Sequence, residues 1–189
     1  MPNKVIWPGS TQLAPVPAVL VGCGNDTEFK HNLITVAWAG IVCSNPPMVS
    51  VSIRPERYSR GLIESTGEFT VNIPTVAMAE AVDYCGMVSG RDVDKFKAVN
   101  LTAKKGSKVA APIVNECPLA LECKVVHSLK LGSHIMYVGE IVAVQAEKSL
   151  IDEKGKFNLT EANILGYAHG GYYGLTESVG SFGFSVKKK

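Results

Sequence analysis

The chain has 189 residues, of which 46% are hydrophobic, and its formal net charge is only +2. This length and apolar content predict one domain over residues 1–189, and the small charge argues against nucleic-acid binding. No apolar run reaches the roughly 18 residues that span a bilayer, and residues 1–11 lack the pattern of a signal peptide. We therefore expect a cytoplasmic protein that does not enter membranes, with the lysines at 187–189 in a solvated tail.

The first half of the chain predicts strands separated by turns. Four segments combine apolar and β-branched residues and are typical of strands, at 18–22, 33–42, 48–53 and 69–73. The prolines at 46 and 47 end the second of them. Two helices are predicted, one at 59–65 that Gly67 closes and one at 75–85 that Thr75 can cap.

The second half continues the β-rich pattern after a polar loop at 89–96. Long strands are expected at 119–126 and 135–144, joined by a turn at Gly132. The tail at 165–184 is rich in glycine and tyrosine. About six or seven strands with two or three short helices predict a mainly β fold, a β-barrel with peripheral helices and not a doubly wound sheet.

Five cysteines are spread along the chain at long spacings, and no CxxC pair occurs. This pattern disfavours a zinc or cluster site and predicts free, buried thiols in a reducing compartment. Among them, Cys43 is the one expected to lie nearest to a ligand. No two histidines have the spacing of metal ligands, so we predict no metal site.

Residues 31–59 have the properties of a site for a flat, phosphorylated ligand. Backbone N–H groups of residues 35–37 and the Asn32 amide suit the polar edge of a flavin ring, where negative charge develops on reduction. Arg54, Arg57 and Ser59 suit a phosphate, because guanidinium and hydroxyl groups donate to its oxygens. The alternative is an ordinary strand followed by solvated arginines. No dinucleotide fingerprint or P-loop is present.

Six segments together resemble the flavin reductase-like family, which has the FMN-binding split-barrel fold, and in particular its flavoredoxin branch. They are "NLITVAW" (32–38), "CSNPPMVSVSIRPERYSRGLI" (43–63), "GEFTVNIP" (67–74), "SGRDVDKF" (89–96), "ECPLALEC" (116–123) and "GSHIMYVGEIV" (132–142). They occur in the family's order, and the resemblance covers roughly residues 15–145.

The resemblance implies a homodimer that binds FMN and transfers electrons. The donor is NADH or NADPH in a flavin reductase, whereas a flavoredoxin-type carrier exchanges electrons with a redox-protein partner. The residues at the family's flavin-binding segments are Asn32, Thr35, Val36, Ala37, Cys43, Ser44, Ser52, Arg54, Tyr58 and Ser59. Lys95 and Phe96 match a pair that closes over the cofactor, and His134 matches a histidine near the nicotinamide, our candidate catalytic residue.

Several residues keep more than one interpretation at this stage. Tyr167, Tyr172 and Tyr173 can either stack on FMN or cover an edge of the barrel. A face covered by residues 167–176 favours the electron carrier, an open one favours the reductase, and a site buried on all sides favours a flavin-storage protein. Glu122 fits an outward strand position, for which a salt-linked surface carboxylate is the expected interpretation.

Overall fold

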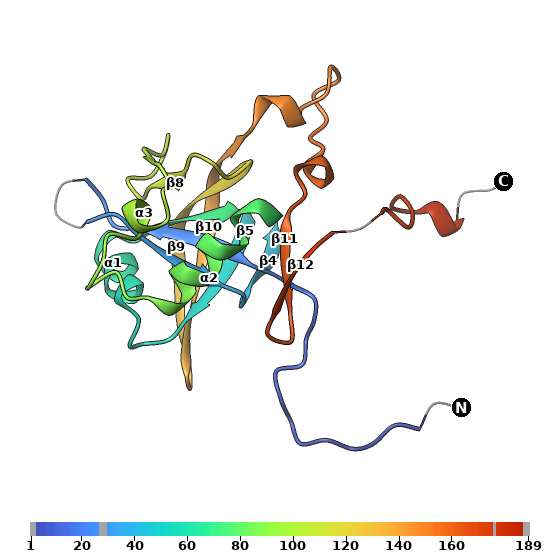
Figure 1. The fold of residues 1–189 in the computed structure, drawn as a ribbon, viewed down its shortest axis with the longest axis horizontal. Coiled ribbons are helices and arrows are strands. Elements are labelled where there is room, and N and C mark those ends of the chain that lie inside the picture. Colours follow the sequence, from blue (N-terminus) through green and yellow to red (C-terminus); the bar gives the residue numbers. More distant parts are fainter. Residues whose placement is uncertain (1–2, 27–29, 176, 187–189) are drawn as a thin grey trace.

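The structure is a computed structural model that describes residues 3–26, 30–175 and 177–186. The predicted lysine tail at 187–189 therefore lies outside the described residues. In Figure 1 the two ends of the described chain extend away from a central β structure. In the part of the chain described, no helix is long and apolar enough to cross a membrane.

A seven-stranded antiparallel sheet forms the body of the molecule, with the strand order β3-β2-β6-β9-β10-β5-β4. Its strands are β2 (Val19–Cys23), β3 (Asn32–Val36), β4 (Ala39–Ser44), β5 (Pro47–Ile53), β6 (Glu68–Ile73), β9 (Leu119–Leu131) and β10 (His134–Ala146). Each strand predicted from the sequence belongs to this sheet, although β9 and β10 are longer than expected. Gly132 makes the predicted turn between them, with a φ of 60°.

The sheet curls until its two edges approach each other. β3 lies at one edge and β4 at the other, yet only Ala37 and Trp38 separate them in the chain. The carbonyl of Trp38 accepts a hydrogen bond of 2.9 Å from the backbone N–H of Ser52 on β5. The predicted mainly β barrel is therefore confirmed, but the single strand expected at 33–42 is in fact two strands with a bend between them.

Two apolar clusters occupy the two faces of the sheet. Val19 and Val21 pack into the barrel interior with Phe69 and Tyr137, whereas Leu20, on the same strand, packs on the outer face. This split follows from the alternation of side chains along a strand. The outer cluster lies beneath helices that cover this face of the sheet. Apolar side chains therefore fill the barrel interior, and helices pack on part of its outer face.

The helices are short and peripheral, as predicted. They are α1 (Tyr58–Thr66), α2 (Ala79–Met87) and α3 (Lys95–Ala98). Gly67 ends α1 in a left-handed conformation with a φ of 67°, and its N–H donates to the carbonyl of Ile63. The helix expected at 75–85 is divided, because a 3-10 turn precedes α2. The 3-10 turns are η1 (Val76–Met78), η2 (Lys148–Leu150), η3 (Leu159–Ala162) and η4 (Phe184–Val186).

The glycine-rich tail contains a hairpin that was not predicted. It pairs with the N-terminal segment to form a small sheet with the order β1-β11-β12, and a further two-stranded sheet lies at β7 and β8. These strands are β1 (Val16–Pro17), β11 (Leu165–Ala168), β12 (Gly171–Gly174), β7 (Ala103–Lys104) and β8 (Ile113–Val114). All five cysteines are free, as predicted.

Candidate cofactor-binding groove

Three adjoining cavities run beside β3 and the bend that follows it. We call them the cationic, central and outer cavities, with volumes of about 220, 370 and 490 Å³. Ile34 and Arg57 line both the cationic and the central cavity. The central and outer cavities share four residues, namely Ala37, Trp38, Ser52 and His134. The three therefore form one continuous groove.

The cationic cavity contains a buried ammonium group. Lys95 is 4% exposed, and its Nζ donates hydrogen bonds of 2.7 Å to the carbonyls of Leu33 and Cys85. An ammonium has three N–H donors, so one remains after these two bonds. Burial lowers the pKa of Lys95 below its ordinary value of 10.5, and the charge of Arg57 lowers this pKa further. A bound anion would relieve both effects.

Two guanidinium groups join this ammonium at the cavity wall. Arg57 and Arg91 both line it, and the guanidinium of Arg91 lies 5.7 Å from the centre of the Tyr58 ring. In residues 3–26, 30–175 and 177–186, no carboxylate forms an ion pair with either arginine or with Lys95. Glu56 also lines the cavity, but it is exposed and lies 3.8 Å from Arg54. The cavity is thus short of negative charge.

Neutral donors complete the cationic cavity. Ser59 is 2% exposed in the first turn of α1, and its hydroxyl accepts a hydrogen bond of 2.8 Å from the Asn32 amide. That hydroxyl also forms a hydrogen bond with the Cys23 side chain, and it can turn its proton towards a ligand. The first N–H groups of a helix favour anions. Gly90 lies close above them, because a Cβ at this position would be 2.0 Å from the Asn32 Oδ1. A tetrahedral phosphate fits this donor set.

The central cavity follows the open edge of β3. The carbonyl of Leu33 points away from β2, since it accepts from Lys95. Backbone groups alternate along a strand, so the N–H of Thr35 points to the same open side. The Thr35 hydroxyl, which we expected along the flavin edge, instead donates to the carbonyl of Val82 on α2. The strand therefore offers backbone groups to a ligand and not this hydroxyl.

His134 lies where the central and outer cavities meet. Its Nδ1 is 2.9 Å from the Ser133 hydroxyl, which leaves Nε2 for another partner. Burial lowers the pKa of His134 from its ordinary value of 6.5, and the nearby charge of Arg54 lowers it further. The imidazole is therefore mostly neutral at pH 7, and it can donate or accept a hydrogen bond without adding charge.

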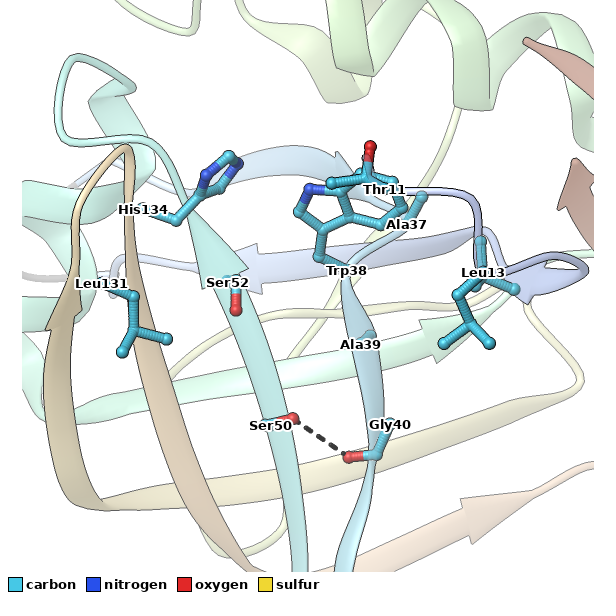
Figure 2. Close-up of a pocket in the computed structure, with 11 residues that line it drawn as sticks. Thr11, Leu13, Ala37, Trp38, Ala39, Gly40, Ser50, Ser52, Leu131 and His134 are labelled. Atoms are coloured by element: carbon cyan, nitrogen blue, oxygen red, sulfur yellow. Dashed lines mark hydrogen bonds between the residues drawn. The ribbon is translucent and has the colours of Figure 1, made fainter. Parts of the chain in front are cut away.

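The outer cavity is mainly apolar. Figure 2 shows Trp38, from the bend between β3 and β4, and His134, from the start of β10, on either side of Ser52, with Leu131 and Leu13 at the two sides. No charged side chain is present among the described residues that line it, apart from the titratable His134. Such a space suits a flat, uncharged ring next to the central cavity.

Three of the predicted ligand residues do not line the groove. Cys43 and Ser44 lie at the end of β4, outside all three cavities. Phe96 packs in the outer apolar cluster, and its ring centre is 6.4 Å from that of His31. It therefore does not cover the groove. Val36 lines the central cavity and also belongs to the apolar cluster of the barrel interior.

Many residues of the lining were outside the set predicted from the family's segments, and three of them bear on the cofactor. Arg57 lines two cavities, as its suitability for a phosphate had indicated, although the family's segments named only Arg54. Arg91 comes from the polar loop at 89–96, whose composition was the one signal for it. Tyr167 lines the central cavity from the unpredicted hairpin. The remaining predicted residues line the groove, namely Asn32, Thr35, Ala37, Ser52, Arg54, Tyr58, Ser59, Lys95 and His134.

Comparison with known proteins places this groove in a family. The family model described as "Flavin reductase like domain" matches residues 11–176. Flavoredoxin of Desulfovibrio vulgaris (Miyazaki F) is 34% identical, with a TM-score of 0.90 over 98% of this chain and 100% of that chain. Flavoredoxin from Methanosarcina acetivorans is 30% identical, with a TM-score of 0.88 over 98% of each chain.

A third solved structure connects the fold with a flavin. It is an FMN-binding protein from Thermus thermophilus, 27% identical, with a TM-score of 0.79 over 96% of this chain and 98% of that chain. These neighbours confirm the expected split-barrel fold, and the FMN-binding protein agrees with the flavin expected from the sequence. The match over residues 11–176 and the resemblance to both flavoredoxins show that this chain belongs to the flavin reductase-like family.

Proposed function

We propose that this protein is an FMN-dependent oxidoreductase that accepts hydride from NADH or NADPH. FMN is the cofactor that the family and the FMN-binding neighbour support. The observation that carries the proposal is the cationic cavity, in which the Lys95 ammonium is buried without a carboxylate partner in the described part of the chain. A phosphorylated cofactor supplies the missing negative charge.

The phosphate of FMN would be held at this end of the groove. Lys95 contributes its remaining N–H, Arg57 and Arg91 contribute guanidinium donors, and Ser59 contributes its hydroxyl. Hydrogen bonds between charged partners are stronger than neutral ones, so this cluster supplies much of the binding free energy. Asn32 positions the Ser59 hydroxyl through their hydrogen bond of 2.8 Å.

The flavin ring would occupy the central cavity, against the open edge of β3. Bound FMN supplies the redox chemistry, because its ring accepts a hydride and passes the electrons on. The Thr35 backbone N–H faces that ring, and donors there favour negative charge on the reduced form. The neutral His134 imidazole orients the carboxamide of a nicotinamide in the outer cavity.

The proposal includes a homodimer built from single-domain protomers. β4 is an edge strand of the sheet, and its side chains Ile41 and Val42 are 66% and 52% exposed. An apolar edge strand attracts a partner, because its backbone groups and side chains are both uncovered. Ala39 and Gly40 of the same strand line the outer cavity, so a second protomer on β4 would also border the site.

An electron carrier with tightly bound FMN and no nicotinamide reaction is the second candidate. Tyr167 lines the central cavity and supports this alternative, because a covered ring would exchange electrons with a redox protein through an exposed edge. The outer cavity of about 490 Å³ supports the reductase instead, since it leaves room for a nicotinamide beside the ring cavity. The two functions differ in whether NADH or NADPH reacts directly.

An anaerobic titration tests the proposal. The protein is loaded with FMN, NADH or NADPH is added in separate cuvettes, and the visible absorption band of oxidised flavin is followed. Rapid bleaching by either nucleotide is the expected result and identifies the donor. If neither nucleotide bleaches the band while dithionite does, the reductase is excluded and the carrier is favoured. Failure to bind FMN would overturn both candidates.

A further inference from the structure

The hairpin of β11 and β12 brings a tyrosine to the wall of the central cavity. Tyr167 lies on β11 and lines this cavity together with His134, which comes from the distant strand β10. The hairpin is tied to the body of the protein, because Tyr167 pairs with Val16 of β1. An aromatic ring is thus fixed at the place proposed for the flavin.

A second tyrosine supports the first. The Tyr172 ring lies against the Tyr167 ring in an edge-to-face arrangement, with centres 5.6 Å apart and an interplanar angle of 64°. Pairs of this geometry are favourable because the positive edge of one ring meets the negative face of the other. The Tyr172 hydroxyl donates a hydrogen bond of 3.1 Å to Asp83 Oδ1 on α2.

The same helix also positions the strand that borders the cavity. Val82 of α2 accepts the Thr35 hydroxyl of β3, and the next residue, Asp83, accepts the Tyr172 hydroxyl. Burial and the nearby carboxylate raise the pKa of Tyr172 to about 12, so its hydroxyl stays protonated as a donor at neutral pH. Two adjacent residues of α2 therefore fix both β3 and the tyrosine pair relative to each other.

We propose that Tyr167 contacts the flavin ring and that Tyr172 and Asp83 are positioning residues that hold it there. This inference rests on the proposed function, since it requires FMN in the central cavity. It also gives the unpredicted hairpin a role, because the hairpin closes one side of the ring site. A redox substrate would then reach the ring from the outer cavity, where the described lining is uncharged.

Flavin fluorescence tests the inference without measuring activity. A tyrosine ring in contact with a flavin quenches its emission by electron transfer, so FMN bound to the wild-type protein should be strongly quenched. Tyr167→Leu should raise the emission of bound FMN severalfold. Tyr172→Phe keeps the ring but removes the bond to Asp83, so it should raise the emission by a smaller factor. Asp83→Ala removes the acceptor of that bond, so it should raise the emission by a factor similar to that of Tyr172→Phe.

Tyr173→Phe is the matched control, because this neighbouring tyrosine is 60% exposed and lines none of the three cavities. Emission is compared only after titration has shown that every variant is saturated with FMN. If the wild-type protein binds no FMN, the proposed function itself fails. Trp38 lines the same cavity as Tyr167 and can also quench, so Tyr167→Leu is repeated in a Trp38→Leu background. If the protein binds FMN but Tyr167→Leu leaves the emission unchanged in both backgrounds, the inference about Tyr167 is wrong while the cofactor site stands.

Discussion

Two buried charges in this protein, a carboxylate and an ammonium, are treated differently by the fold. Glu122 is 0% exposed, and the chain surrounds it with donors. They are the backbone N–H groups of Ser107, Lys108 and Val109, the Ser107 hydroxyl and the Gln145 amide. Lys95 is 4% exposed, but among the described residues it donates to just two carbonyls, and it faces a cavity lined by further cations.

The contrast distinguishes a structural charge from a ligand-binding charge. A buried ion is stable only when hydrogen bonds or an opposite charge replace the water it has lost. The chain itself supplies these partners to Glu122, so this carboxylate fixes the loop that carries Ser107. Around Lys95 the described chain forms no ion pair, so a ligand has to supply the negative charge.

Replacing Glu122 should have the largest effect on stability. Glu122→Gln places an amide NH2 among several buried N–H donors, and we expect the free energy of unfolding to fall by about 3 kcal/mol or more. Denaturant unfolding at pH 7 measures this change. Glu116→Gln is the control, because Glu116 is an exposed carboxylate that accepts from the Thr102 N–H. An equal loss in the two variants would contradict the comparison.

The stability contributed by Glu122 should also depend on pH. Burial raises its pKa, but the hydrogen bonds from Gln145, Ser107 and Lys108 outweigh burial and lower the pKa from 4.5 to about 2. Because the folded-state pKa lies below the unfolded one, the stabilisation is complete above pH 4.5 and is lost as the pH falls towards 2. This shift corresponds to about 3 kcal/mol, so wild type and Glu122→Gln should converge in acid.

Replacing Lys95 should weaken the binding of FMN more than it lowers the stability of the fold. Lys95→Met removes one charge-assisted hydrogen bond to the phosphate, which is worth about 2 kcal/mol, or roughly a 30-fold increase in the Kd for FMN. Fluorescence titration with FMN measures it. The control is Lys97→Met, since Lys97 is two residues away and its side chain is 86% exposed. Unchanged FMN affinity in Lys95→Met would show that the Lys95 ammonium does not bind the phosphate.

The two arginines at 54 and 57 should contribute unequally. Arg57 lines both the cationic and the central cavity, so Arg57→Ala should raise the Kd for FMN about tenfold. The Arg54 side chain is 56% exposed and lies 3.8 Å from Glu56. Arg54→Ala should therefore change the Kd for FMN about twofold or less. The reverse order would show that Arg54, and not Arg57, is the main phosphate ligand of the pair.

Local patterns predicted the scaffold and part of the groove. The strands, the Gly67 helix end and the turn at Gly132 follow from residues close together in the sequence. Asn32 and Ser59 were predictable for the same reason, because they lie on β3 and at the start of α1. Arg91 was not placed at the site, and Tyr167 was left between stacking on FMN and covering an edge, because a loop and a distant hairpin bring them there through tertiary contacts.

Glu122 shows why the burial of a strand residue is harder to predict than the face of the sheet to which its side chain points. It lies between Leu121 and Cys123, which pack in or against the barrel core, so its side chain points outward as expected. The expectation of a surface carboxylate was nevertheless wrong, because the loop containing Ser107 and Val109 covers this outer position. A strand pattern indicates which face a side chain takes, but it does not indicate what packs over that face.

At Gly90 we expect a smaller effect than at Lys95 or Arg57, and this position separates the groove's shape from its charge. Gly90→Ala would bring a Cβ within 2.0 Å of the Asn32 Oδ1, and Asn32 would have to move away from the Ser59 hydroxyl. The loss of that bond costs about 1 kcal/mol, so the Kd for FMN should rise about fivefold with every cation retained. Gly61→Ala on α1 has nothing within 4 Å of its new Cβ and should leave the Kd unchanged. If both substitutions leave it unchanged, the phosphate site depends on charge alone, and the Asn32–Ser59 bond does not position the ligand.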